Sequence, residues 1–381
     1  MNLNEHKFVI LGSYTANVLG QVRGLGERGI HPYGVLIHKN TFCIDKSKYW
    51  AKVFCAETIE EGLDIVIHEF GNETVKPFLY TDRDDVMGLI DRKYDMLKDK
   101  FYLWNADEQG RLNKYLNKAE QLRLAEECGF KVPQTEMVKL GETPHTLQYP
   151  IFTKAIDSLN EWWKGCASIC NNEKDLKDFC KKLEVEYIIL QELIDKKDET
   201  PIEGISINGG KDIVLFGMTN NYRMPSDSFG TYRHIESFDD KSTEECIRRF
   251  IQRINYTGAF EIELIIDKSG NAYFLEANFR IAQQNYGYTV FGANIPYIYA
   301  KSVLSGEIAR DEIKITKKHP LNMMYEFEDF RVFVLSKQIS LWRWLKDLKQ
   351  TDVFLFFNKK DNAPFYFTIW EKVSNSIKKR F

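Results

Sequence analysis

The sequence predicts an α/β protein with an N-terminal parallel sheet and an antiparallel hairpin in its second half. Three observations lead to this class. Residues 7–37 have the strand, turn, helix and strand pattern that builds a parallel sheet. Residues 58–97 continue the alternation as helix, strand and helix. Residues 258–280 hold two runs of β-branched and aromatic residues on either side of a turn signal, which is typical of a hairpin.

The N-terminal unit is Rossmann-like in pattern. A buried strand over Lys7–Gly12 is followed by a helix over about Ala16–Arg28, and Tyr33–Ile37 supplies a second strand. The glycine fingerprint of dinucleotide-binding proteins is incomplete, because Gly12 stands alone before Gly20. The unit therefore supports a parallel sheet better than it supports a dinucleotide site.

Asp82 and Asp84 follow the next expected strand, which ends at Tyr80. Open α/β sheets bind ligands at the carboxyl ends of their strands, so these carboxylates are candidates for a ligand site. Capping of the following helix explains them equally well.

The helix expected over Glu108–Gly129 contains Lys118. Further on, Tyr149–Ala155 is an apolar strand with Lys154 near its end. A lysine in such a strand needs an anionic partner or a route to water. It also suits an edge strand, where lysine discourages unwanted pairing.

The hairpin around Asp267–Asn271 is the most informative stretch. If its turn centres on Ser269 and Gly270, Glu263 lies directly opposite Glu276. Alternation then gives one polar face: Glu261, Glu263, Ile265, Glu276, Asn278 and Arg280. The other face is apolar: Ile262, Leu264, Ile266, Tyr273, Leu275, Ala277 and Phe279.

Two carboxylates directly opposite one another repel, so the polar face needs a compensating charge. Carboxylate and amide oxygens are the ligands of Mg²⁺, which proteins hold with one or two carboxylates together with substrate phosphates. A solvated outer face of an antiparallel sheet would show the same alternation.

The order Glu-x12-Glu-x-Asn-x-Arg, preceded by Lys118, Lys154 and the Gln191-Glu192 pair, resembles the ATP-grasp superfamily. Its members are ligases that join a carboxylate to an amine or a related nucleophile. The resemblance covers residues 8–306 and is nearest to the carboxylate–amine ligase branch. It implies a Rossmann-like domain over residues 1–105, followed by a two-lobed ATP-grasp domain.

The ATP-grasp domain would span residues 106–308, with lobes of about 106–190 and 191–308. Residues 309–381 would form a C-terminal extension to which the resemblance assigns no role.

The resemblance also implies a role for each matching residue. Lys118 and Lys154 would reach the phosphates of ATP, and Glu203 would bind its ribose. The adenine would be read near one short linker: Gln191, Glu192, Leu193 and Ile194. Mg²⁺, or Mn²⁺ in its place, would be held by three residues: Glu263, Glu276 and Asn278. The arginines complete the set, with Arg280 steadying the transferred phosphoryl group and Arg233 binding a substrate carboxylate.

Several of these residues have plainer explanations. Lys118 could be a solvated helix residue, Glu203 a surface carboxylate and Arg233 a surface arginine, with Arg223 the alternative carboxylate binder. Residues 158–165 stand where the family has a glycine-rich lid over the phosphates. They contain one glycine and two tryptophans, so no phosphate contact is assigned there, although Lys164 could substitute.

The function implied is ATP-dependent formation of an amide-like bond through an acyl phosphate, with release of ADP and phosphate. Substrates would be a small carboxylate and an amine, such as an amino acid, a peptide or a precursor of the cell wall or of a surface polymer. A homodimer is expected by analogy. A nucleotide-binding relative without catalysis stays open, and so, with less support, does an NAD(P)-dependent oxidoreductase.

The composition limits other classes. A net charge of −3 over 381 residues gives no strong pull toward nucleic acid or an anionic membrane. No apolar run approaches the length of a membrane span, and the polar N-terminus does not have the pattern of a signal peptide. We therefore expect a cytoplasmic protein. The run from Lys378 to Arg380 carries three charges, too few to indicate membrane binding.

Overall fold

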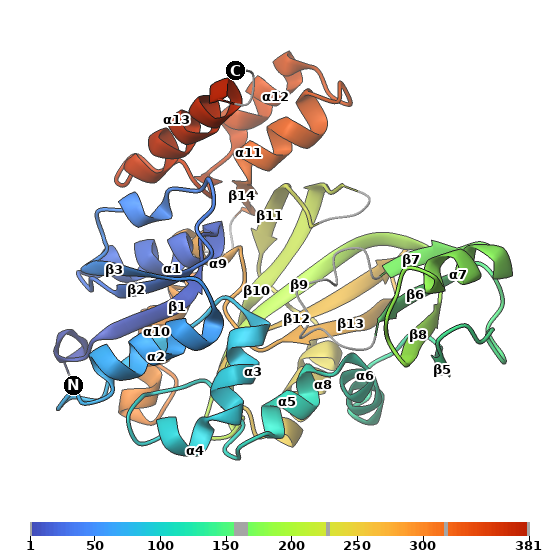
Figure 1. Ribbon diagram of the computed structural model, residues 1–381, viewed down its shortest axis with the longest axis horizontal. Coiled ribbons are helices and arrows are strands. Elements are labelled where there is room, and N and C mark those ends of the chain that lie inside the picture. Colours follow the sequence, from blue (N-terminus) through green and yellow to red (C-terminus); the bar gives the residue numbers. More distant parts are fainter. Residues whose placement is uncertain (1, 156–166, 226–228, 316–318, 379–381) are drawn as a thin grey trace.

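The computed structural model describes residues 2–155, 167–225, 229–315 and 319–378, and its strands form three sheets (Figure 1). A parallel four-stranded sheet comes first in the chain, an antiparallel four-stranded sheet follows, and a seven-stranded sheet lies between them. The C-terminal helices gather at one end of the molecule (Figure 1). The predicted α/β class, with parallel and antiparallel parts, is confirmed.

The parallel sheet has the strand order β3-β2-β1-β4. Its strands are β1 Phe8–Ser13, β2 Tyr33–Ile37, β3 Lys52–Ala56 and β4 Phe78–Tyr80. Its helices are α1 Ala16–Gly26, α2 Ile59–Phe70, α3 Asp84–Arg92 and α4 Tyr94–Leu97, with short 3-10 turns at Leu3–Glu5 and Ile44–Lys46. Alternate side chains of β1 enter two different cores, because Ile10 faces the body of the protein and Val9 faces α2 and α3.

The antiparallel four-stranded sheet has the order β5-β8-β6-β7 and its own small core. Its elements are β5 Thr135–Lys139, β6 Ile151–Ala155, β7 Ala167–Cys170, α7 Glu173–Cys180 and β8 Tyr187–Glu192. Residues 193–195 lead from β8 directly into the first strand of the seven-stranded sheet. The linker therefore joins two sheets with separate cores.

The seven-stranded sheet has the order β13-β12-β9-β10-β11-β14-β15. Its strands are β9 Lys196–Ile207, β10 Asp212–Arg223, β11 Tyr232–Glu236, β12 Gly258–Asp267, β13 Ala272–Asn278, β14 Leu321–Met324 and β15 Val353–Phe354. Nearby helices are α8 Lys241–Ile254, α9 Asn285–Phe291 and α10 Ile295–Ser305. Helices α9 and α10 both pack against α1, which fastens the parallel sheet to this part of the chain.

The helix predicted over Glu108–Gly129 is wrong in one respect, because the chain forms two helices there. They are α5 Arg111–Leu116 and α6 Lys118–Glu127. Asn117 has an extended backbone, and its side chain accepts hydrogen bonds from the first amides of α6. Lys118 is therefore the first residue of α6 rather than an interior residue of one long helix.

The last part of the chain does not form a separate unit. Strands β14 and β15 extend the seven-stranded sheet, and a 3-10 turn at Arg310–Glu312 precedes them. The remaining elements are α11 Glu326–Asp329, a π-helical turn Phe330–Val334, α12 Leu341–Gln350 and α13 Ala363–Lys378. No helix in the described ranges is long and apolar enough to cross a membrane.

A buried ion pair joins the two ends of the chain. The Nε of Arg23 in α1 lies 3.0 Å from Oδ2 of Asp361, and both side chains are fully buried. Arg23 also donates to the carbonyls of Leu355, Phe356 and Asp361, while Asp361 accepts from the Ser47 hydroxyl and the Lys48 amide. The pair is thus surrounded by hydrogen bonds that satisfy both charges.

We predict that Asp361→Ala lowers the free energy of unfolding by about 3–5 kcal/mol, because it leaves the Arg23 charge buried without its counter-ion. Urea denaturation measures this. The matched control is Asp95→Ala, which removes an exposed partner of Lys98 and should cost less than about 1 kcal/mol. Equal losses in the two variants would contradict the importance of the buried pair.

Candidate functional site

The hairpin β12–β13 places Glu263 directly opposite Glu276 and Glu261 opposite Asn278, as the sequence predicted. Nearer the turn the register shifts by one residue, because Leu264 pairs with Phe274 and leaves Leu275 as a bulge. The prediction that Tyr273 and Leu275 lie on the apolar face is therefore wrong. Phe274 takes that place and is fully buried.

Three carboxylates gather on the polar face. Glu261 of β12 pairs with Glu203 of the neighbouring strand β9, and Glu263 is the next residue along that face of β12. Burial and then the charges of Glu261 and Glu276 raise the pKa of Glu263 well above its ordinary value. Burial and then the charge of Glu261 raise the pKa of Glu203 well above its ordinary value. The Oε1 atom of Glu203 has no hydrogen-bond partner among the described residues. The three carboxyl groups are thus crowded together, and both Glu203 and Glu263 resist ionisation.

Asn278 and Gln284 hold this cluster together. The amide nitrogen of Asn278 donates to Glu261 over 3.1 Å and to Glu263 over 3.0 Å. Gln284 donates to the other oxygen of Glu261 and accepts from Arg233 over 3.0 Å. Arg233 is thereby tied to the cluster through Gln284, which the sequence did not single out.

Two lysines approach the hairpin from different elements. Nζ of Lys118, at the start of α6, lies 2.8 Å from Oε2 of Glu276. Burial opposes ionisation of Glu276, but the positive charges of Lys118, Lys154 and Arg280 lower its pKa to about 2. Lys154 comes from β6 in the other sheet and is 7% exposed. Burial and then the charge of Lys118 lower its pKa to about 8.

Gln121 fixes this arrangement from α6. Its side chain donates to the carbonyl of Ala277 over 2.9 Å and accepts from the amide of Ala277 over 2.8 Å. Ala277 lies between Glu276 and Asn278 on the edge strand β13, whose outer backbone groups would otherwise be unpaired. Gln121 stands one helical turn after Lys118, so one helix both completes the sheet edge and sets the lysine beside Glu276.

Arg280 connects the hairpin to the parallel sheet. Its Nε lies 3.1 Å from Oδ1 of Asp84, at the start of α3. Asp82 lies at the same end of the sheet and accepts hydrogen bonds from the Ser13 amide and the Thr15 hydroxyl. Both acidic residues noted after β4 therefore stand beside the hairpin. Neither caps α3 with its side chain, because Arg83 occupies the N-cap position.

The alternative carboxylate binder, Arg223, is not free to act as one. Its guanidinium contacts Asp329 at 2.8 Å and Asp347 at 2.5 Å, both in the C-terminal part of the chain. Arg233 is buried and faces the carboxylate cluster, where it donates to the Gly230 carbonyl as well as to Gln284. Of the two arginines, the structure brings only Arg233 to this site.

The linker residues lie at the end of β8. Gln191 is buried and donates to the Thr135 hydroxyl, while Glu192 exchanges hydrogen bonds with Gln134, the residue before β5. Leu193 is 37% exposed. Residues 158–165, where the sequence suggested a lid and Lys164, lie outside the described residues.

The donor set fits Mg²⁺ by chemistry, since Glu263, Glu276 and Asn278 offer only carboxylate and amide groups on one face. Within the described ranges, no three acidic, histidine or cysteine side chains gather closely enough to hold a metal by themselves. The buried excess of carboxylates, including the unpaired oxygen of Glu203, also favours a cation here.

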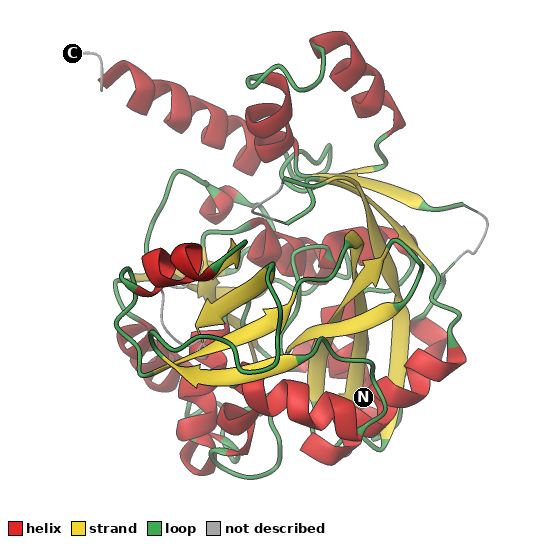
Figure 2. Ribbon diagram, turned by 90° about the vertical axis from the view of Figure 1, so that its right-hand side faces the viewer, coloured by secondary structure: helices red, strands yellow, loops and turns green. Residues whose placement is uncertain are grey.

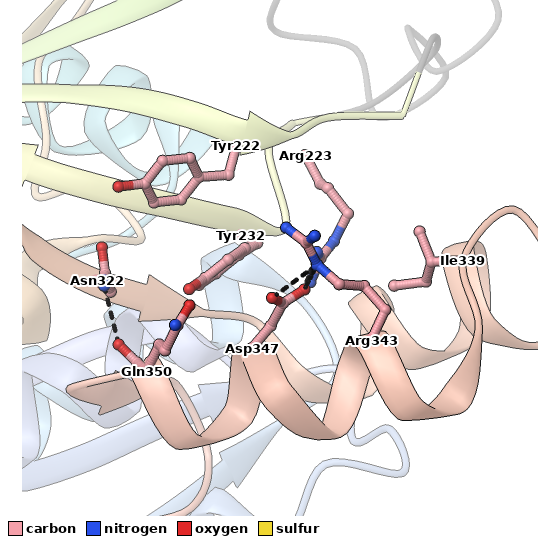
Figure 3. Close-up of a pocket in the computed structure, with 8 residues that line it drawn as sticks. All are labelled: Tyr222, Arg223, Tyr232, Asn322, Ile339, Arg343, Asp347 and Gln350. Carbon is pink, nitrogen blue, oxygen red and sulfur yellow. Dashed lines mark hydrogen bonds and ion pairs between the residues drawn. The ribbon is translucent and has the colours of Figure 1, made fainter.

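A hollow of about 490 Å³ lies between the ends of β10 and β11 and helix α12 (Figure 3). Its charged side chains contact one another: Arg223 and Arg343 both bind Asp347. Asn322 donates to the Gln350 carbonyl. None of the carboxylates of the hairpin lines it, so this hollow is separate from the candidate site.

Sequence reasoning missed Gln121, Gln284 and the part played by Glu261. The alternation along β12 placed Glu261 on the polar face, and this signal was sufficient to include it. Gln121 and Gln284 carried no signal, because an isolated glutamine in a helix or loop is ordinary until its partners are known.

We predict that Gln121→Leu lowers the free energy of unfolding by about 2–4 kcal/mol, because it leaves two buried backbone groups of Ala277 without partners. Urea denaturation tests this, with Gln252→Leu as the control on an exposed position of α8. A loss no larger than that of the control would show that Gln121 does not hold β13.

Comparison with solved structures finds the same fold in several enzymes. The L-amino acid ligase of Bacillus licheniformis shares 15% identity, with 81% of this chain and 78% of that chain covered at a TM-score of 0.63. The N5-carboxyaminoimidazole synthetase of Staphylococcus aureus shares 16% identity, with 87% and 86% covered at 0.64. The biotin carboxylase domain of the Hydrogenobacter thermophilus 2-oxoglutarate carboxylase, solved with MgADP and bicarbonate, shares 16% identity, with 81% and 72% covered at 0.61.

No family model and no curated protein matches the sequence. The likeness is therefore one of architecture, and it extends over 81–87% of this chain in the structures compared. The expected resemblance is confirmed at that level: this chain has the ATP-grasp fold.

Proposed function

We propose that the protein is an ATP-dependent ligase that activates a carboxylate as an acyl phosphate and joins it to an amine, releasing ADP and phosphate. The observation that carries the proposal is the hairpin face on which Glu263 and Glu276 lie opposite one another, with Lys118, Lys154 and Arg280 directed at the same region. The shared fold supports it, because solved structures of that fold include ligases and carboxylases.

Each residue has a proposed task. Glu263, Glu276 and Asn278 would hold Mg²⁺, which neutralises phosphate charge when bound. Lys118 and Lys154 would bind the phosphates, and the ion pair between Lys118 and Glu276 would open as the nucleotide enters. The linker from Gln191 to Ile194 would receive the adenine, and Glu203 the ribose.

The chemistry proposed is positioning and charge neutralisation, so it needs no nucleophilic side chain. The substrate carboxylate attacks the γ-phosphate and ADP leaves, and the amine then displaces phosphate from the acyl phosphate. Arg280 would steady the acyl phosphate from the side of Asp84. Arg233, held by Gln284, would orient a carboxylate. An amino acid is the first substrate class to test.

We predict that, when pools of amino acids or small carboxylates are added with ATP, one pool stimulates release of ADP and phosphate. In Glu276→Gln the rate of this release should fall by about 10²–10³-fold. The control is Glu120→Gln, a partly exposed glutamate on α6. A wild-type rate in Glu276→Gln would refute the proposed metal site. ATP binding without release in any pool would favour a nucleotide-binding protein without catalysis.

Lys154 gives a second prediction. Because its pKa is about 8 in the free protein, close to half of the molecules carry a neutral Lys154 at pH 8. Phosphates placed beside it would raise this pKa, so ATP binding takes up about half a proton at pH 8 and weakens as the pH rises further. Calorimetry in buffers of different ionisation enthalpy measures the uptake. Lys154→Arg stays charged and should take up about half a proton less than the wild type, whereas equal uptake in both would place the protonation elsewhere.

A further inference from the structure

Helices α12 and α13 turn apolar side chains toward solvent. The exposed residues are Leu341, Trp342, Leu345, Tyr366, Phe367, Ile369, Trp370, Val373 and Ile377. Trp342 is 82% exposed and Trp370 65% exposed. Both helices lie at the same end of the molecule (Figure 1). Exposed apolar side chains in this number on two helices at one end of the molecule mark an interaction surface.

The apolar face of α13 is the face turned away from the protein. Tyr366, Trp370, Val373 and Ile377 recur at helical spacing and form one stripe. The opposite side holds the helix to the body, where Thr368 is buried and accepts a hydrogen bond of 2.9 Å from the amide of Cys43. An ordinary surface helix buries its apolar stripe and exposes its polar side, so α13 has the reverse arrangement.

Positive charge surrounds this apolar surface. Residues 331–378 contain nine Lys and Arg against four Asp and Glu, although the whole chain has a net charge of −3. Two of the four acids, Asp347 and Asp361, are buried in ion pairs and contribute little to the outer surface. Exposed lysines accompany the apolar side chains on both helices: Lys346 and Lys349 on α12, and Lys378 on α13.

We propose that α12 and α13 bind the protein to the surface of an anionic lipid bilayer. A helix with aromatic and aliphatic residues on one face and lysines beside them lies in the plane of the membrane interface. Trp342 and Trp370 would enter the headgroup region, which tryptophan favours, and the lysines would contact anionic headgroups.

Charge argues against a second copy of this chain as the partner. In a two-fold dimer the same surface meets itself, so the basic border of each copy would face that of the other. An anionic bilayer supplies the opposite charge. Both helices lie at one end of the molecule (Figure 1 and Figure 2). This inference does not depend on the proposed ligase activity.

The test is co-sedimentation of the full chain with vesicles of phosphatidylcholine alone, or of phosphatidylcholine mixed with phosphatidylglycerol. We expect binding to the mixed vesicles, a blue shift of tryptophan fluorescence on binding, and release at about 0.5 M salt, where surface charges are screened. The double variant Trp342→Glu/Trp370→Glu should lose at least about tenfold in binding. Lys346→Glu/Lys349→Glu should lose about tenfold or more.

The control is Met96→Glu, which changes a 47% exposed apolar residue on α4 and should bind like the wild type. Unchanged thermal unfolding of each variant shows that binding was not lost through misfolding. Absence of binding to the mixed vesicles, or equal binding to both kinds, would overturn the proposal. It would also be overturned if the wild type sediments as a dimer that the tryptophan variant converts to a monomer, because the surface would then belong to a second copy.

Discussion

The close packing of three carboxylates where β9 and β12 meet, with Glu203 and Glu261 buried, is the constraint on which the candidate site depends. Glu203, Glu261 and Glu263 repel one another in a region from which water is largely excluded, so like charges there are costly. Nearby cations offset part of that cost, and each comes from a different part of the chain. Lys118 begins α6, Lys154 ends β6, and Arg280 follows β13. The two lobes and the parallel sheet meet at the place where this charge is balanced.

The sequence was sufficient to predict the cross-strand pairs of this site, because the alternation of side chains along a strand depends only on local backbone geometry. The pairs Glu263–Glu276 and Glu261–Asn278 follow from the turn position and the period of two. The rule failed beyond Leu275, since a bulge depends on how the strand packs against its neighbours, and this cannot be read from one hairpin. The break at Asn117 was missed for a related reason. Apolar spacing continues across it, and only the capping contacts reveal two helices.

Other features depend on partners that are distant in the sequence. Gln121 acquires its importance only when β13 lies beside α6, and Arg223 is explained by acids of the C-terminal part of the chain. That part showed no recognisable motif, yet it contributes two strands to the largest sheet and a buried counter-ion to α1. From sequence alone, the three basic residues at 378–380 were too few to indicate membrane binding. The exposure of the tryptophans beside the lysines, which sequence cannot give, changes that interpretation.

The ion pair between Arg23 and Asp361 has a consequence for folding during synthesis. The two residues are 338 positions apart, so the ribosome makes Arg23 long before its counter-ion exists. Until residues 321–361 have been made, α1 carries a guanidinium that the folded protein buries, and strands β14 and β15 are missing from their sheet edge. Domains usually fold in the order of synthesis, but this N-terminal unit completes its core only when the final segment arrives. Loss of Asp361 and the residues after it would therefore leave the first helix of the chain without its buried counter-ion.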